Sequence, residues 1–193
     1  MLEMSIGLVV VGILAGMSTP TVRLYANHFK QVKEKVIIKE LNKSVIGYAM
    51  SRGGFPDSAV GDLLPSTNIG MTSINSYDSE VQYFVNALLT ETATAGNFTS
   101  LCDTAKNILD GTTASTIPAI CNDVSSSFVD CADSTVMAFV LVSSGKNKEK
   151  DHENGDADQA FENPTKKPNV DQDYDDLVTS YGLAELVSEC QNL

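Results

Sequence analysis

Uncharged residues make up the first part of the chain, where no Asp, Glu, Lys or Arg occurs from Met4 to Val22. Nineteen residues at about 1.5 Å each form a helix roughly 28 Å long, close to the hydrocarbon thickness of a bilayer. Residues 1–22 therefore predict a hydrophobic segment that can span a membrane. Residues 23–52 continue the helix with amphipathic character, so we expect one rod that extends to Arg52.

Apolar residues recur along the amphipathic part of this rod at three- and four-residue steps. The first group is Val22, Tyr25, Phe29, Val32 and Val36. A second group continues and broadens the stripe, namely Ile37, Ile38, Leu41, Val45, Ile46, Ala49 and Met50. A broader stripe is suited to burial under a second layer of structure. The lysines between them are expected to face solvent or a neighbouring subunit, where they could also meet an acidic head (Lys30, Lys33, Lys35, Lys39, Lys43).

We expect the remaining residues, 53–193, to fold into one globular head. Paired glycines and the following proline, Gly53-Gly54 and Pro56, end the rod. Residues 57–79 are rich in polar and turn-forming residues and predict a loop. Two strands are expected at 81–85 and 176–180, and a short helix that carries Cys102 at 98–110.

The segment from Thr135 to Ser143 predicts the central strand of the head, because it is rich in β-branched and large apolar residues and is apolar on both faces. We expect this strand to pack against the apolar stripe of the rod. The predicted fold class is therefore α+β, with a long N-terminal helix and a small antiparallel sheet in two layers.

Charge is divided unequally along the chain. The net charge is −12, but residues 1–55 hold seven Lys or Arg against three Glu and so carry +4, which leaves −16 for the rest. An acidic head repels phosphate, so we expect no direct nucleic-acid site.

Four cysteines behind a membrane-spanning segment indicate an oxidising exterior and two disulfides. Of the three pairings we favour Cys102–Cys121, which closes a short loop, and Cys131–Cys190, which ties the C-terminus to the central strand.

Three N-terminal residues carry a resemblance to a known family. The segment resembles that of type IV pilins and type II secretion pseudopilins, whose mature chains have a short apolar run, Glu, and a long apolar run containing Gly and Pro. With Glu3 on the family's glutamate, Gly12 and Pro20 fall on its glycine and proline without a gap. The family has four residues before its glutamate where this chain has two, so we expect a leader and two further residues before Met1.

The resemblance implies a type IV pilin fold and a role for Glu3. A lone carboxylate is costly in hydrocarbon unless it has a partner. Glu3 either stays hydrated at the membrane edge or pairs with the N-terminal amine of a neighbouring subunit and sets the register of a helical filament. Because Pro20 removes a backbone donor, we also expect a kink or a non-helical stretch between Gly12 and Pro20.

An acidic segment, residues 143–178, contains ten Asp or Glu. It resembles the C-terminal loop of pseudopilins, which implies a calcium site built from oxygen ligands. The candidate ligands are Asn147, Asn154, Asp156, Asp158, Asp173, Asp175 and Asp176. The alternative is a solvated acidic loop that keeps the filament soluble.

No arrangement of residues suggests catalysis or a zinc site, and we expect no enzyme. The resemblance implies a structural subunit that lies in the inner membrane before assembly. It would then polymerise with its own copies, through an assembly machinery, into an extracellular filament for adhesion, motility or DNA uptake. The alternatives are a pseudopilin of a type II secretion system and a minor tip pilin that binds a ligand.

Overall fold

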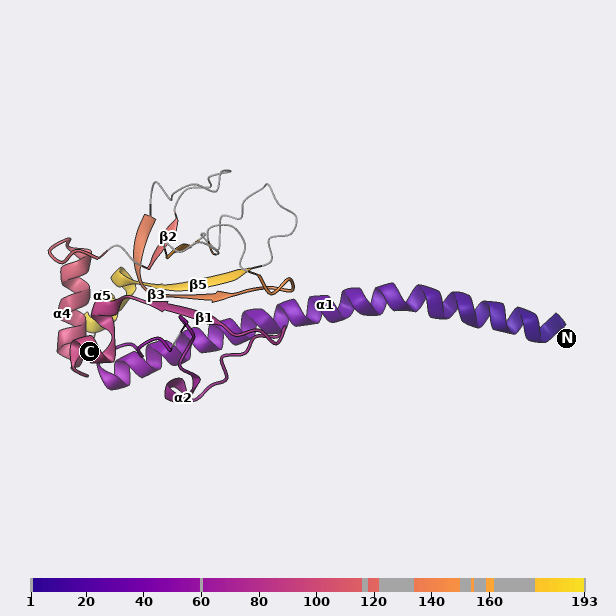
Figure 1. The fold of residues 1–193 in the computed structure, drawn as a ribbon, viewed down its shortest axis with the longest axis horizontal. Coiled ribbons are helices and arrows are strands. Elements are labelled where there is room, and N and C mark those ends of the chain that lie inside the picture. The colour runs from indigo at the N-terminus through magenta and orange to yellow at the C-terminus, as the bar shows by residue number, and fades with distance from the viewer. Residues whose placement is uncertain are drawn as a thin grey trace.

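A long helix and a small head make up the chain (Figure 1). The computed structural model describes residues 2–59, 61–115, 118–121, 134–149, 154, 159–161 and 176–192. Within these ranges the side chains of residues 1–21, 23 and 160 are outside the description. Helix α1 (Leu2–Arg52) extends far beyond the head at its N-terminal end, and its C-terminal part lies under the sheet.

Helix α1 is continuous over 51 residues. The prediction of a non-helical stretch between Gly12 and Pro20 is wrong for the single chain, since a proline removes only one helical hydrogen bond and the flanking turns remain. The predicted helix end is confirmed. Gly53 adopts φ +73° just after Arg52, and a Cβ on Gly54 would lie only 2.5 Å from the Cα of Glu91. The glycine pair therefore both ends α1 and lets the chain pass close to the next layer.

The sheet is built around one long strand, as the sequence predicts. Strand β3 (Ser134–Ser143) pairs antiparallel with β1 (Gln82–Val85), with β2 (Ala119–Cys121) and with β5 (Leu177–Gly182). A short strand β4 (Ala160–Phe161) pairs parallel with β2. The fold is thus α+β, with a long N-terminal helix against a small, mainly antiparallel sheet.

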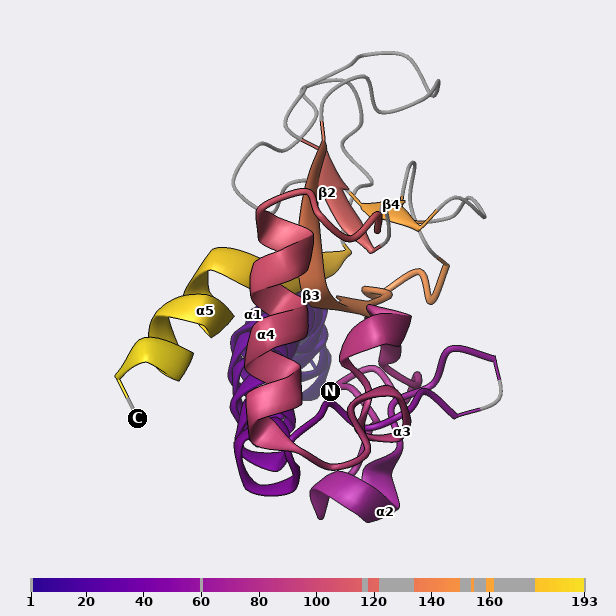
Figure 2. The same ribbon diagram turned by 90° about the vertical axis from the view of Figure 1, so that its left-hand side faces the viewer.

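Short helices close the far end of the head (Figure 2). The predicted helix is α4 (Phe98–Leu109), and the side chain of Asn97 caps it by accepting a hydrogen bond from Thr99 N at 2.9 Å. The connecting segment predicted as loop contains one helical turn, α2 (Ser66–Ile69). The remaining elements were not predicted: η1 (Ala87–Leu89), α3 (Glu91–Thr94) and the C-terminal helix α5 (Leu183–Gln191).

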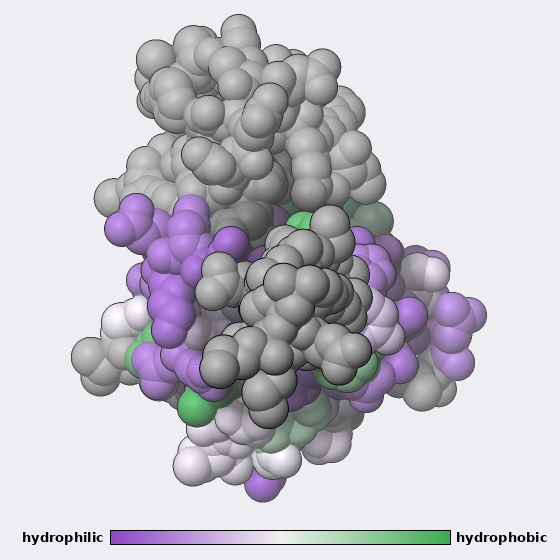
Figure 3. All heavy atoms as spheres, turned by 90° about the vertical axis from the view of Figure 1, so that its right-hand side faces the viewer, coloured by the Kyte–Doolittle hydropathy of each residue, from purple (hydrophilic) through white to green (hydrophobic). Residues whose placement is uncertain are grey.

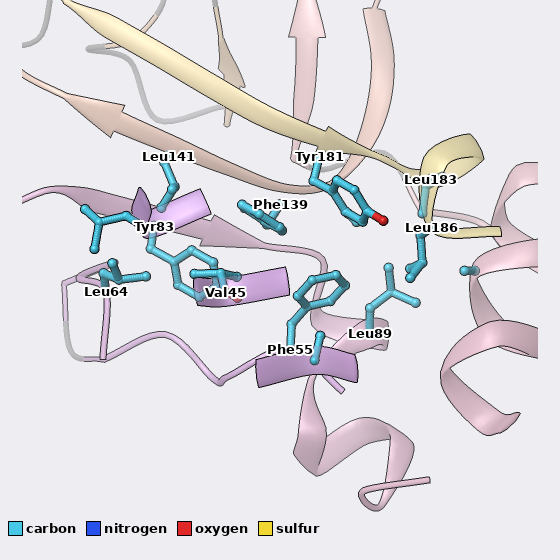
Figure 4. Packing of buried hydrophobic residues seen from close by; sticks show 14 of the residues in the cluster. Val45, Phe55, Leu64, Tyr83, Leu89, Phe139, Leu141, Tyr181, Leu183 and Leu186 are labelled. Atoms are coloured by element: carbon cyan, nitrogen blue, oxygen red, sulfur yellow. The ribbon is translucent and has the colours of Figure 1, made fainter. Parts of the chain in front are cut away.

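Strand β3 is buried on both faces, which confirms the interpretation of its unbroken apolar sequence. Phe139 and Leu141 join the core cluster between the sheet and α1, whereas Val140 and Val142 join a second cluster on the other face. On the α1 side, Phe139 packs against Phe55 at a ring-centroid distance of 5.3 Å and against Tyr181 at 5.8 Å (Figure 4). Leu41 and Val45 of α1 belong to the same cluster, which therefore holds the C-terminal part of α1 against the sheet.

A disulfide joins the two larger helices of the head. Cys102 of α4 bonds to Cys190 of α5, so both pairings favoured from the sequence are wrong. The prediction rested on a short loop for the first pair and on a tie from the C-terminus to the central strand for the second. The bonded pair is instead 88 residues apart and is brought together by the packing of α4 against α5. Cys121 is also disulfide-bonded, and Cys131 lies outside the described residues.

Candidate assembly surface

The middle of α1, residues 25–36, exposes a stripe of apolar side chains. Tyr25 is 75% exposed and Phe29 64% exposed, and Val32 and Val36 are also exposed. At spacings of four, three and four residues these side chains share one side of the helix, and we call them the exposed stripe. A row of large apolar groups in water is typical of a surface that binds a partner.

The C-terminal half of α1 carries the buried stripe. Ile38, Leu41, Val45 and Ala49 all belong to the core cluster between the helix and the sheet. Val36 is 55% exposed and Ile38 is 4% exposed, although only two residues separate them. Two residues are about 200° around an α-helix, so the exposed stripe points away from the chain's own head. The sequence pattern had suggested one continuous stripe, and the structure separates it into two opposite faces.

A buried carboxylate lies on the head-facing side of α1, between Val32 and Val36 in the sequence. Glu34 is 4% exposed and accepts hydrogen bonds from the Ser143 hydroxyl and, at 2.6 Å, from Ser76 N. Asn75 Nδ2 donates at 2.9 Å both to Ser143 Oγ and to the carbonyl of Ser144. This buried network ties α1 to the connecting segment and to the end of β3, just where the acidic segment begins.

Sequence reasoning missed the role of Glu34, which it counted only as a charge. The available signal was its position, because Glu34 precedes Leu41 by seven residues and Val45 by eleven and so shares their side of the helix. A charged residue at a core-facing position is rare without hydrogen-bond partners. That spacing could have predicted a buried acceptor.

A second polar link joins the end of α1 to helix α3. The hydroxyl of Tyr48 donates a hydrogen bond to Glu91. Burial, with the hydrogen bond to Glu91 and its negative charge, raises the pKa of Tyr48 to about 12. The phenol therefore stays neutral and remains a donor throughout the physiological pH range.

The three residues that carry the family resemblance lie in the N-terminal part of α1, which extends beyond the head (Figure 1). The backbone at Glu3, Gly12 and Pro20 is helical, and their side chains are outside the description. Within the part of the chain that the structure describes, no helix is long and apolar enough to cross a membrane. The segment Met4–Val22 falls almost entirely outside the residues whose side chains are described.

The structure brings together two of the seven candidate calcium ligands. Asn154 and Asp176 are both buried, and Asn154 Nδ2 donates to Asp176 Oδ2 at 3.0 Å. Asn147 is exposed in the turn after β3, where its Oδ1 accepts from Glu149 N at 3.0 Å. The other four, Asp156, Asp158, Asp173 and Asp175, lie outside the described residues. Among the residues described, no group of three or more His, Cys, Asp or Glu is placed to hold a metal ion.

Hydrophilic side chains surround the rod when the molecule is viewed from its N-terminal end, with a few apolar groups between them (Figure 3). The geometry thus combines an exposed apolar helix with a polar head. No protein-family model, curated protein or solved structure matches this chain.

Proposed function

We propose that this chain is a type IV pilin-like subunit that polymerises through α1 into an extracellular filament for adhesion, motility or DNA uptake. The observation that carries the proposal is the exposed stripe, Tyr25, Phe29, Val32 and Val36, which faces away from the head. The register of Glu3, Gly12 and Pro20, the long N-terminal helix and the small antiparallel sheet support it.

Burial of the exposed stripe between copies is the energetic basis of this proposal. Each large apolar side chain moved from water into an interior contributes about 1.5–3 kcal/mol. Four such side chains from one copy would contribute about 6–12 kcal/mol, which is comparable to the entropic cost of association. The hydrophobic segment that precedes them would hold the subunit in the inner membrane until the assembly machinery adds it to the filament.

In this proposal Glu3 sets the axial register of the filament by pairing with the N-terminal amine of the next subunit. Glu3→Ala should leave the chain in the membrane, because hydrophobicity drives insertion, and should abolish or disorder filaments. Negative-stain microscopy of surface-sheared material measures the filaments, and fractionation measures membrane insertion. Glu40→Ala is the matched control, since Glu40 is an exposed carboxylate on the same helix.

The same microscopy separates the proposal from its alternatives. Abundant filaments from the unchanged chain support a pilus subunit. A chain that inserts into the membrane and yields no filaments would instead act as a pseudopilin or as a tip subunit that binds a ligand. Normal filaments from Glu3→Ala would contradict the pairing role.

We also propose that calcium orders the acidic segment of the head. The supporting observation is that Asn154 and Asp176, which lie 22 positions apart in the sequence, meet in the protein interior. A divalent cation bound by this segment would offset the repulsion among the ten carboxylates of its sequence. Calcium should then raise the melting temperature of the full chain in detergent, by an amount that grows with its concentration, and magnesium should do less.

Calorimetry of the full chain with calcium, with magnesium and with a chelator tests this second proposal. Asp156→Ala and Asp175→Ala should each reduce the calcium effect, and Asp103→Ala, an exposed carboxylate on α4, should not. Equal melting temperatures at millimolar calcium and with chelator would leave the solvated acidic loop as the explanation.

A further inference from the structure

The side of α1 that faces β5 forms a basic groove of about 430 Å³. Lys35, Lys39 and Lys43 line it, spaced four residues apart, and Leu177 and Val178 of β5 also line it. The three lysine side chains are exposed, and among the described residues only Lys43 forms an ion pair, at 3.4 Å with the exposed Glu40. This basic groove thus offers a row of cations beside an apolar wall.

A stretch of the head has the opposite charge. Residues 53–105 contain six Asp or Glu and no Lys or Arg. Four of the six acids lie between residues 57 and 80, and all four are exposed (Asp57, Asp62, Asp78, Glu80). We call residues 57–80 the acidic flank.

The basic groove and the acidic flank lie on opposite sides of α1. Asn42 Nδ2 donates to Thr179 Oγ1 of β5 at 3.2 Å, whereas Ser44 Oγ donates to Met71 Sδ of the acidic flank at 2.7 Å. Asn42 and Ser44 are two residues apart, which is about 200° around the helix. Figure 2 shows α2, which belongs to the acidic flank, and α5, which follows β5 in the chain, on different sides of α1.

The two surfaces also lie at the same height along the rod. The lysines of the groove occupy residues 35–43 of α1. The acidic flank contacts α1 from Lys30, whose carbonyl accepts from Ser76 Oγ at 3.0 Å, to Ser44, which donates to Met71. Two parallel copies placed side by side therefore bring one copy's groove against the other's acidic flank with only a small axial shift.

We propose that the acidic flank of one copy docks in the basic groove of a second copy of this chain. This inference rests on the proposed function, because it requires parallel copies in one filament. Complementary surfaces on opposite sides of a subunit form a head-to-tail contact, which repeats along an open helical assembly. Exposed ion pairs are individually weak and are screened by salt, so this contact selects the neighbour and its orientation, while the exposed stripe supplies the driving force.

Carbodiimide cross-linking of filaments from the full chain tests the contact. The reagent joins amines to carboxylates that touch, and within one copy the groove and the flank are separated by the helix. Mass spectrometry should find Lys35, Lys39 or Lys43 linked to Asp57, Asp62, Asp78 or Glu80. These links should be absent after detergent disperses the filaments, and Lys106, an exposed lysine on α4, should not form them.

Charge reversal provides an independent measurement. Lys35→Glu with Lys39→Glu should lower the yield of sedimentable filaments several-fold, and Asp78→Lys with Glu80→Lys should do the same. All four changes together should restore the yield of filaments, because the groove then carries carboxylates and the flank carries lysines, so the two surfaces attract each other again. Lys106→Glu is the control, and circular dichroism of each variant verifies that the head remains folded.

The outcomes separate this inference from the proposed function. Filaments whose groove lysines link only to other carboxylates, or only to a different acidic protein, would overturn the docking contact and leave assembly through α1 standing. Failure of the fourfold variant to regain filaments while each variant folds would also overturn it. Absence of any sedimentable assembly from the unchanged chain would overturn both proposals.

Discussion

Two successive segments of α1, residues 25–36 and residues 38–49, have similar apolar periodicity and opposite surroundings. In the first segment Tyr25 and Phe29 face water, and in the second segment Leu41 and Val45 are buried against the sheet. Val32 and Leu41 are nine residues apart, which is about 180° around the helix. Periodicity therefore predicts that a face exists, and only the packing of the head shows which of two faces it covers.

This difference separates two kinds of apolar surface on one element. The buried stripe stabilises the folded chain, because the head covers it. The exposed stripe has no cover among the described residues and is the surface that we propose for association. Substitutions in the exposed stripe should accordingly change filament yield, and substitutions in the buried stripe should change the free energy of unfolding.

The largest effect is expected from the exposed stripe. Tyr25→Ser combined with Phe29→Ser should lower filament yield by about tenfold or more, because two aromatic side chains would no longer be buried between copies. The melting temperature of the head should stay the same, since both side chains are exposed in the single chain. Filament yield is measured by sedimentation and microscopy, with Gln31→Ser as the control in the same exposed segment. Filaments at the normal yield would show that the exposed stripe is not the association surface.

The next effect is expected from the buried stripe. Leu41→Ala should lower the free energy of unfolding by about 2–5 kcal/mol, because it opens a cavity in the core. Val36→Ala removes a similar apolar group from the opposite face of the helix. This variant should change the free energy of unfolding by no more than about 0.5 kcal/mol. Denaturant unfolding of the full chain in detergent, followed by circular dichroism, gives both values. Equal decreases in the free energy of unfolding in the two variants would mean that the exposed and buried stripes contribute equally to the stability of the single chain.

The smallest of the three effects is expected at Glu34, the buried carboxylate of α1. Glu34→Ala should cost about 1–3 kcal/mol, because Ser143 and Ser76 N lose their acceptor in a buried site. Glu34→Gln should cost less, since its amide oxygen can still accept from Ser76 N and the Ser143 hydroxyl can turn. Hydrogen exchange of the Ser76 amide measures the local opening, and Glu40→Ala, exposed on the same helix, is the control. Unchanged exchange at Ser76 in Glu34→Ala would show that the network does not hold the connecting segment.

Elements with strong local signals were predictable. The end of α1 is set by Gly53 and Gly54, where a side chain would collide with the neighbouring backbone, and α4 is set by its apolar spacing and its Asn97 cap. Strand β3 was predictable because most of its side chains are β-branched or large and apolar, and from Ala138 to Ser143 it is buried on both faces. The C-terminal helix α5 was missed, although Glu185 reaches back to Gly182 N at 3.0 Å in the manner of a capping interaction.

By itself the sequence determined the long helix, its end at Arg52 and the central strand, because these depend on neighbouring residues and on backbone preferences. The tertiary structure alone decided the Cys102–Cys190 pairing, the burial of Glu34 and the direction of the exposed stripe. Each of these depends on residues distant in sequence that meet only after the head packs on one side of α1. A one-dimensional pattern has the periodicity of a helix but no information on which side the rest of the chain will cover.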